Sequence, residues 1–150
     1  MTTQLHGILF AYRDNPHLRE LTSHRTVASI PFGGRYRMID FMLSNMVNAG
    51  IVDIGVVMQE KCLSLLDHLG SGKDWDLARK RGGLRVLPPF TNQSRNFRGK
   101  MEALYGVYTY MEDIRQDYVL MADADVACNI DLEAVFQAHL ESGADITAVC

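Results

Sequence analysis

Short runs of apolar residues alternate along the chain with longer segments in which apolar side chains recur at helical spacing. The apolar runs, several of them rich in β-branched residues, predict strands at 6–11, 51–59, 84–89, 118–125 and 144–150. The segments with helical spacing predict helices at 35–50, 61–70, 100–114 and 131–143. Gly50, Gly70 and Gly143 stand where such helices end.

Strands that alternate with helices predict the α/β class, with a mainly parallel sheet covered by helices on both faces. The order is that of a Rossmann-like fold, in which ligands bind beyond the carboxyl ends of the strands. The candidates for a site are therefore the positions that follow the predicted strands: the loops 11–20 and 88–99, Gln59, Asp123 and Asp125.

The composition is that of a globular domain, since 47% of the 150 residues are hydrophobic and 22% are charged. A formal net charge of −3 offers no basic surface and argues against nucleic-acid binding. The chain lacks a signal peptide and a run long enough to cross a membrane, so we expect a soluble, cytoplasmic protein. Cys62, Cys128 and Cys150 lack metal-site spacing and are expected as reduced thiols. The last predicted strand stops abruptly at Cys150, which favours an N-terminal piece of a longer chain.

Two polar motifs contain candidates for binding an anion, and the first is PFGGRYRMIDF. Gly33 and Gly34 permit a tight turn there, and Arg35 or Arg37 can meet an anionic group. The plainer interpretation is a turn whose arginines are solvated or pair with Asp40.

The second motif is RNFRGKMEAL, which places Arg98 and Gly99 at the start of a predicted helix. Free N–H groups at a helix N-terminus favour a phosphate or a sugar hydroxyl. The plainer interpretation is an ordinary helix start with Gly99 near the cap and Glu102 in the first turn.

The motif MADADVACNID places carboxylates at the end of a predicted strand. Such carboxylates hold a divalent cation in sugar-nucleotide enzymes, where the cation bridges the acid and the substrate phosphates. Asp131 fits a helix N-cap followed by Glu133, so we interpret it as structural. Asp125 is compatible with either a metal ligand or a turn residue.

Taken in order, several runs of the chain resemble the bacterial ADP-glucose pyrophosphorylases (glucose-1-phosphate adenylyltransferases). The runs are PFGGRYRMIDFMLSN, NAGIVDIGVVMQ, SLLDHL, FRGKMEALY and ESGADITAV, and the similarity spans nearly all of the chain. The resemblance implies a Rossmann-like nucleotidyltransferase domain over 1–150, followed beyond residue 150 by a left-handed β-helix domain. Members join ATP and glucose 1-phosphate into ADP-glucose and pyrophosphate in glycogen synthesis, and the catalytic members use Mg²⁺.

The loop after the first predicted strand departs from the catalytic pattern G-G-x-G-x-R-L-x-P-L-T. This chain reads AYRDNPHLRELT and contains no glycine there. Ala11, Tyr12 and the run 14–16 replace the glycines, and His17 stands where the arginine would be. Side chains fill the space that phosphates would need, and Pro16 removes an N–H donor. The sequence therefore indicates a degenerate nucleotide loop.

Further departures follow along the chain. Val27 replaces a lysine that relatives use, with an arginine matched here by Arg37, to bind allosteric effectors. Lys100 and Glu102 replace a threonine and an aspartate, whereas Arg98 and Gly99 are kept. Asp125 matches the metal-binding catalytic aspartate, but a single carboxylate cannot replace a lost phosphate cradle.

This pattern resembles the non-catalytic, regulatory (GlgD-type) subunit of the enzyme. It implies a hetero-oligomer, with a heterotetramer expected, in which this chain raises the activity of a catalytic subunit and itself needs no cofactor. A sugar-phosphate effector is a further expectation, with Gly33, Gly34, Arg37, Arg98 and Gly99 as candidate ligand-binding residues and Asp125 as the candidate metal ligand. The alternatives are an active nucleotidyltransferase of low efficiency and a stand-alone module that binds a sugar phosphate.

Tyrosines in the helix predicted at 100–114 point in several directions, so they cannot all face the sheet. We expect at least one of Tyr105, Tyr108 and Tyr110 at a subunit contact, because interface centres are enriched in aromatic residues. The alternative is that they are surface residues with solvated hydroxyl groups.

Overall fold

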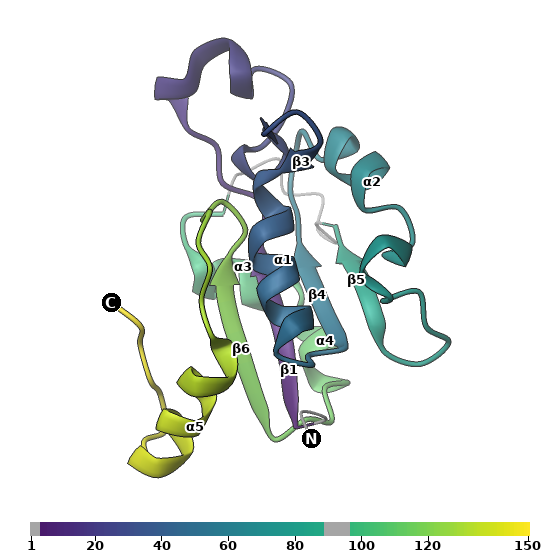
Figure 1. Ribbon diagram of the computed structural model, residues 1–150. Helices are drawn as coiled ribbons and strands as arrows, with labels where there is room; N and C mark the ends of the chain where they lie inside the picture. Colours follow the sequence, from purple (N-terminus) through teal and green to yellow (C-terminus); the bar gives the residue numbers. More distant parts are fainter. Residues whose placement is uncertain (1–3, 89–96) are drawn as a thin grey trace.

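The computed structural model describes residues 4–88 and 97–150. Its centre is a parallel sheet with the strand order β5-β4-β1-β6 (Figure 1). The strands are β1 (Leu5–Phe10), β4 (Asp53–Val57), β5 (Gly83–Leu87) and β6 (Tyr118–Asp123). A separate antiparallel hairpin consists of β2 (Pro31–Phe32) and β3 (Tyr36–Arg37). The predicted α/β fold with a mainly parallel sheet is confirmed.

Helices cover both faces of this sheet, as predicted (Figure 1). The helices that pack on one face are α1 (Met38–Asn48), α2 (Leu63–Leu69) and α5 (Leu132–Ser142). The helices on the other face are α3 (Lys100–Gly106) and α4 (Tyr108–Glu112). Short 3-10 segments lie at Pro16–Thr22, Val27–Ser29 and Lys73–Trp75.

The central strand β1 is buried along its whole length. Leu5 and Leu9 belong to the apolar cluster under α1, whereas Ile8 and Phe10 belong to the cluster under α3. Side chains of a strand alternate between its two faces, so one continuous apolar run supplies both cores.

Helix α1 is shorter than predicted at its N-terminal end. It begins at Met38 rather than Arg35, because the preceding residues form the β2–β3 hairpin. Gly33 and Gly34 connect the two strands with φ angles of 60° and 83°. This left-handed backbone explains why glycine stands at both positions of the turn.

The helix predicted at 100–114 is interrupted at Val107, which separates α3 from α4. Two local features favour the break: Gly106 has a low helix propensity, and Val107 is β-branched. The ring of Phe97 lies where a side chain at Gly106 would stand, 3.2 Å from the ideal Cβ position.

The prediction of a strand at 144–150 is wrong. These residues form no strand, all of their side chains are exposed, and the segment leads away from the sheet (Figure 1). A strand needs a neighbour that pairs with its backbone groups, and in the described part of the chain no strand pairs with this segment. The strand predicted at 84–89 forms as β5. Pro89, at its end, and residues 90–96 of the predicted loop lie outside the described residues.

A polar cluster is buried at the amino ends of the strands. His6 is 1% exposed, and its Nε2 atom lies 3.0 Å from the Tyr110 hydroxyl. Asp53 Oδ2 lies 3.8 Å from His6 Nδ1 and accepts a hydrogen bond from Gln116. Burial lowers the pKa of His6, although the Asp53 carboxylate opposes the shift and Arg85 adds to it. The fold therefore favours the neutral form of His6.

We predict that His6 makes the protein less stable as the pH falls. The imidazole of His6 binds a proton near pH 6.5 in the unfolded chain, whereas it resists protonation in the folded chain. The contribution of His6 to the free energy of unfolding is therefore fully present above pH 6.5 and is lost as the pH falls below it. Between pH 7 and pH 5, the unfolding free energy of the wild type should fall more steeply than that of His6→Gln. The difference is at most about 1.4 kcal/mol per pH unit. Urea unfolding at each pH measures it, and equal slopes would contradict the prediction.

Two glycines with similar backbone angles differ in their surroundings. Gly83, at the start of β5, has a φ of 87°, and a Cβ atom there would lie 2.2 Å from the carbonyl oxygen of Leu77. Gly34 has a φ of 83°, and a Cβ atom there would meet nothing within 4 Å. Of these two glycines, Gly83 alone combines backbone strain with a steric clash.

Gly83→Ala should therefore destabilise the fold much more than the matched variant Gly34→Ala. We expect a loss of about 3 kcal/mol or more for Gly83→Ala, and about 1 kcal/mol from strain alone for Gly34→Ala. Chemical unfolding of both variants measures the losses. Similar losses would show that the contact with Leu77 relaxes without cost.

Candidate functional site

The carboxyl ends of β1, β4 and β6 meet at one edge of the sheet, the upper edge in Figure 1. The loop that follows β1 and the residues that follow β6 lie at this edge, because parallel strands point the same way. Of the predicted site residues, the structure brings together the loop 11–20, Asp123 and Asp125 here.

Two carboxylates at this edge are paired with two cations. Asp123 ends β6, Asp125 follows, and their side chains are 21% and 15% exposed. Arg13 Nη1 lies 3.4 Å from Asp125 Oδ2 and 3.9 Å from Asp123 Oδ2. Lys100 Nζ donates a hydrogen bond of 3.0 Å to Asp123 Oδ2. The charges of the carboxylate pair are therefore balanced from within the chain.

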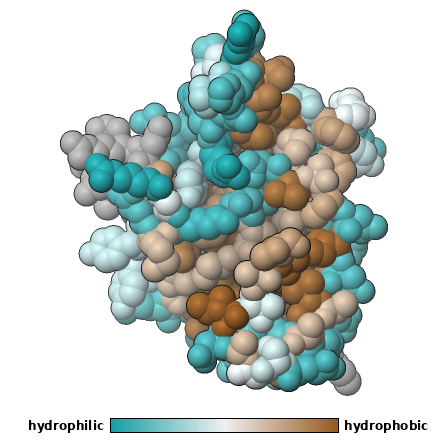
Figure 2. Space-filling view, turned by 90° about the vertical axis from the view of Figure 1, so that its left-hand side faces the viewer, coloured by the Kyte–Doolittle hydropathy of each residue, from teal (hydrophilic) through white to brown (hydrophobic). Residues whose placement is uncertain are grey.

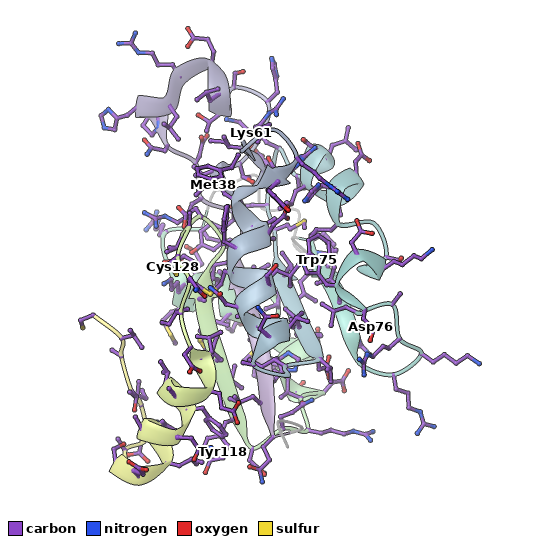
Figure 3. All side chains as sticks on the ribbon, viewed as in Figure 1. Met38, Lys61, Trp75, Asp76, Tyr118 and Cys128 are labelled. Carbon is purple, nitrogen blue, oxygen red and sulfur yellow. The ribbon has the colours of Figure 1, made fainter. Side chains whose placement is uncertain are left out.

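A third cation, Lys61, fastens the loop from the side of α2. Its ammonium group lies 2.7 Å from Asp14 Oδ2 and 2.9 Å from the Thr22 carbonyl oxygen. The hydrogen bond from Lys61 lowers the pKa of the Asp14 carboxyl. Lys61 has a φ of 59°, a left-handed conformation that is uncommon for a residue with a side chain. Figure 3 labels Lys61 at this edge of the sheet, below the turn formed by residues 16–22.

Several backbone N–H groups of the loop after β1 donate hydrogen bonds to acceptors in the same loop. Asn15 N–H donates to the Asp14 side chain, and His17 N–H donates to the Asn15 side chain. Leu18 N–H donates to the Asn15 carbonyl, and Pro16 has no N–H. The N–H groups of Asn15, His17 and Leu18 are therefore committed within the loop itself.

An aromatic contact supports the start of this loop. The Tyr12 ring packs edge-on against Phe97 and Phe10, with centroid separations of 5.2 and 6.1 Å. Burial, followed by the nearby Asp123 carboxylate, raises the pKa of the Tyr12 hydroxyl. Buried Gln59 accepts a hydrogen bond from Phe97 N–H. The large side chain of Tyr12 is thus part of the packing.

Arg98 and Gly99 lie beside Lys100, at the start of α3. Gly99 is the N-cap with an extended φ of −176°, which any residue adopts, and the space around its Cα is open. Arg98 N–H donates to the Glu102 carboxylate at 2.6 Å. These contacts are those of the helix start that we gave as the plainer interpretation.

Arg37 belongs to a different part of the structure. Its guanidinium group donates to the Ser64 carbonyl oxygen of α2 at 2.6 Å, and its backbone N–H donates to Asp40. Asp40 Oδ1 in turn lies 2.6 Å from His68 Nε2. Within the described residues, no hydrogen bond or ion pair connects Arg37 with Asp125. The candidates named from the sequence therefore lie in separate groups.

The structural role predicted for Asp131 is confirmed. Its side chain accepts a hydrogen bond from Ala134 N–H and caps α5. By contrast, sequence reasoning placed Arg13 in the site only as part of the loop 11–20, and it did not assign Lys61 or Lys100 to the site. The signal that was present is the lysine at position 100, which departs from the catalytic pattern of the family that the sequence resembles.

Residues 16–150 match the family described as Nucleotidyl transferase. The chain belongs to this family. It is 39% identical to the glycogen biosynthesis protein GlgD of Geobacillus stearothermophilus, over 99% of this chain and 44% of that protein. It is 38% identical to GlgD of Bacillus subtilis, over 97% and 43%, and 38% identical to a glucose-1-phosphate adenylyltransferase of Geobacillus stearothermophilus, over 94% and 37%. These relatives confirm the resemblance found from the motifs.

The chain spans less than half the length of these relatives. Among solved structures, it is similar to a protein from Bacillus anthracis described as a glucose-1-phosphate thymidylyltransferase, in complex with sucrose. The TM-score is 0.69 at 14% identity, over 91% of this chain and 50% of that one, which supports the fold.

None of the helices in the described part of the chain combines the length and the apolar composition needed to span a membrane. None of the side-chain clusters there contains three or more histidine, cysteine, aspartate or glutamate residues placed to hold a metal ion.

Proposed function

We propose that this chain is part of the regulatory subunit of a glucose-1-phosphate adenylyltransferase in glycogen biosynthesis. In this proposal it turns over little or no substrate itself and raises the activity of a catalytic subunit. The similarity to GlgD proteins and to glucose-1-phosphate adenylyltransferases supports the pathway and the reaction class. The state of the loop after β1 supports the loss of catalysis.

The observation that carries the proposal is the internal hydrogen bonding of the N–H groups in residues 15–18. A nucleotide loop works because its free N–H groups point at phosphate oxygens. Here the N–H groups of Asn15, His17 and Leu18 have partners within the loop, and Pro16 has no N–H. Losing one preorganised donor costs about 3 kcal/mol of transition-state stabilisation, and several are committed together.

We further propose a cytoplasmic hetero-oligomer, a heterotetramer with the catalytic subunit, that responds to a sugar-phosphate effector. Arg37 is the candidate effector residue, although its guanidinium already has a partner in Ser64. The runner-up function is a nucleotidyltransferase of low efficiency. The retained carboxylate of Asp125, at the end of β6, favours that alternative.

The proposal predicts that Asp125 is dispensable for ADP-glucose synthesis. The full-length protein alone should show no synthesis above background, and adding its catalytic partner should give more activity than the partner alone. Asp125→Asn in this subunit should change the rate of the mixed complex less than twofold. The corresponding change in the catalytic subunit should abolish it. A similar loss from either substitution would show that this subunit turns over substrate.

A second prediction concerns the partner surface on α3 and α4. Tyr105 and Tyr108 are 82% and 56% exposed, whereas Tyr110 points inward and contacts His6. Met121 of β6 pairs with Ile8, whose side chain lies under α3, so it belongs to the same side of the sheet. Figure 2 shows hydrophobic surface in the middle of the face on the β6 side, framed by hydrophilic atoms.

We expect Tyr105→Ala to weaken assembly with the catalytic subunit at least fivefold, because exposed aromatic residues supply much of the energy of interfaces. Glu141→Ala, an exposed position on α5, is the control and should assemble as the wild type does. Co-elution and titration of the two subunits measure the effect. If Tyr105→Ala and Tyr108→Ala both fold and assemble normally, this face is not the docking surface.

A further inference from the structure

The carboxylate pair at the end of β6 is built into the fold. Ala124, between Asp123 and Asp125, is completely buried, and its N–H donates to the Phe10 carbonyl oxygen at 3.0 Å. This bond continues the pairing of β6 with β1 by one residue. The positions of the two carboxylates are therefore set by the central sheet.

The two cations that meet this pair come from elements on either side of it. Arg13 belongs to the loop after β1, where its carbonyl oxygen accepts a hydrogen bond from Val27 N–H. Lys100 opens α3, and its ammonium group lies 5.5 Å from the centre of the Phe10 ring, within cation–π range. The backbone of Arg13 and the ammonium group of Lys100 thus have contacts apart from the carboxylates.

A divalent cation does not fit this arrangement. Mg²⁺ needs oxygen ligands in octahedral geometry and favours sites with net negative charge. Here two carboxylates face one guanidinium and one ammonium, so the cluster is formally neutral. A bound Mg²⁺ would stand close to two positive charges and would have to displace them.

We propose that Arg13 and Lys100 are permanent counterions that replace a divalent cation at Asp123 and Asp125. The pair then serves to fasten the loop after β1 to the end of β6. This inference rests on the proposed function, since a subunit without turnover does not need a metal at this position.

The carboxylates retain the capacity to bind a metal once the counterions are removed. Oδ1 of Asp123 and Oδ1 of Asp125 are buried and have no hydrogen-bond partner among the described residues. With the two positive charges gone, the Oδ2 atoms that they now contact would be available to a cation. The inference therefore predicts a gain of binding, which damage to the fold would not produce.

The experiment measures Mn²⁺ binding to the full-length protein by electron paramagnetic resonance. The wild type should bind Mn²⁺ only at background level at this pair. Arg13→Gln/Lys100→Gln should bind Mn²⁺ at least tenfold more tightly, and adding Asp125→Asn should remove the gain. The control is Lys80→Gln/Arg81→Gln, which removes the same charge from exposed positions before β5 and should behave as the wild type.

Three outcomes would overturn the inference: wild-type binding as tight as that of the double variant, no gain in the double variant, or an equal gain in the control. If the double variant does not fold, Lys100→Gln alone is measured, with an expected gain of at least threefold. The proposed function fails separately, through ADP-glucose synthesis by this subunit alone. An inactive subunit that binds Mn²⁺ tightly would refute only the inference.

Discussion

The structure depends on one constraint, which is that β1 is paired on both sides and buried on both faces. Its parallel partners β4 and β6 can be reached only through crossover connections, so helices cover both faces of the sheet. Its alternating side chains supply both apolar clusters. Because the strands are parallel, their carboxyl ends meet at one edge, and this edge is the only place where loops distant in sequence, after β1, β4 and β6, can combine.

At that edge, a backbone N–H can be satisfied by the chain or offered to a ligand, but it cannot do both. In the loop after β1, the N–H groups of Asn15, His17 and Leu18 are satisfied by the chain. Asn15 and Pro16 bend it into a 3-10 turn, and the Thr22 hydroxyl donates to the Asn15 carbonyl. Each such bond contributes about 1 kcal/mol of net stability. Asn15, Pro16 and Thr22, which stand in this glycine-free loop, thus supply the contacts that order it.

The two ends of the sheet have different electrostatic character. At the carboxyl end, the charges are only partly buried and opposite charges are paired: Arg13 and Lys100 with the β6 carboxylates, Lys61 with Asp14. At the amino end, buried His6 lies beside the Tyr110 hydroxyl group and the Asp53 carboxylate. Burial favours the neutral form of His6 there, whereas solvent and opposite charges favour ionised groups at the other end. The ion pairs of Asp14, Asp123 and Asp125 therefore lie together at the carboxyl end.

The sequence by itself determined the elements and the character of the loop after β1. Apolar spacing is a local property, so the central strands and α1, α2 and α5 were predictable, as was the absence of glycine at 11–20. Tertiary structure decided what depends on distant partners. Residues 144–150 have β propensity but no neighbouring strand, and Tyr110 faces inward because β1 and β4 leave space beside His6 and Gly55. The ion pairs of Arg13 and Lys100 with the β6 carboxylates join segments far apart in the chain, and only folding brings such charges within a few ångströms of each other.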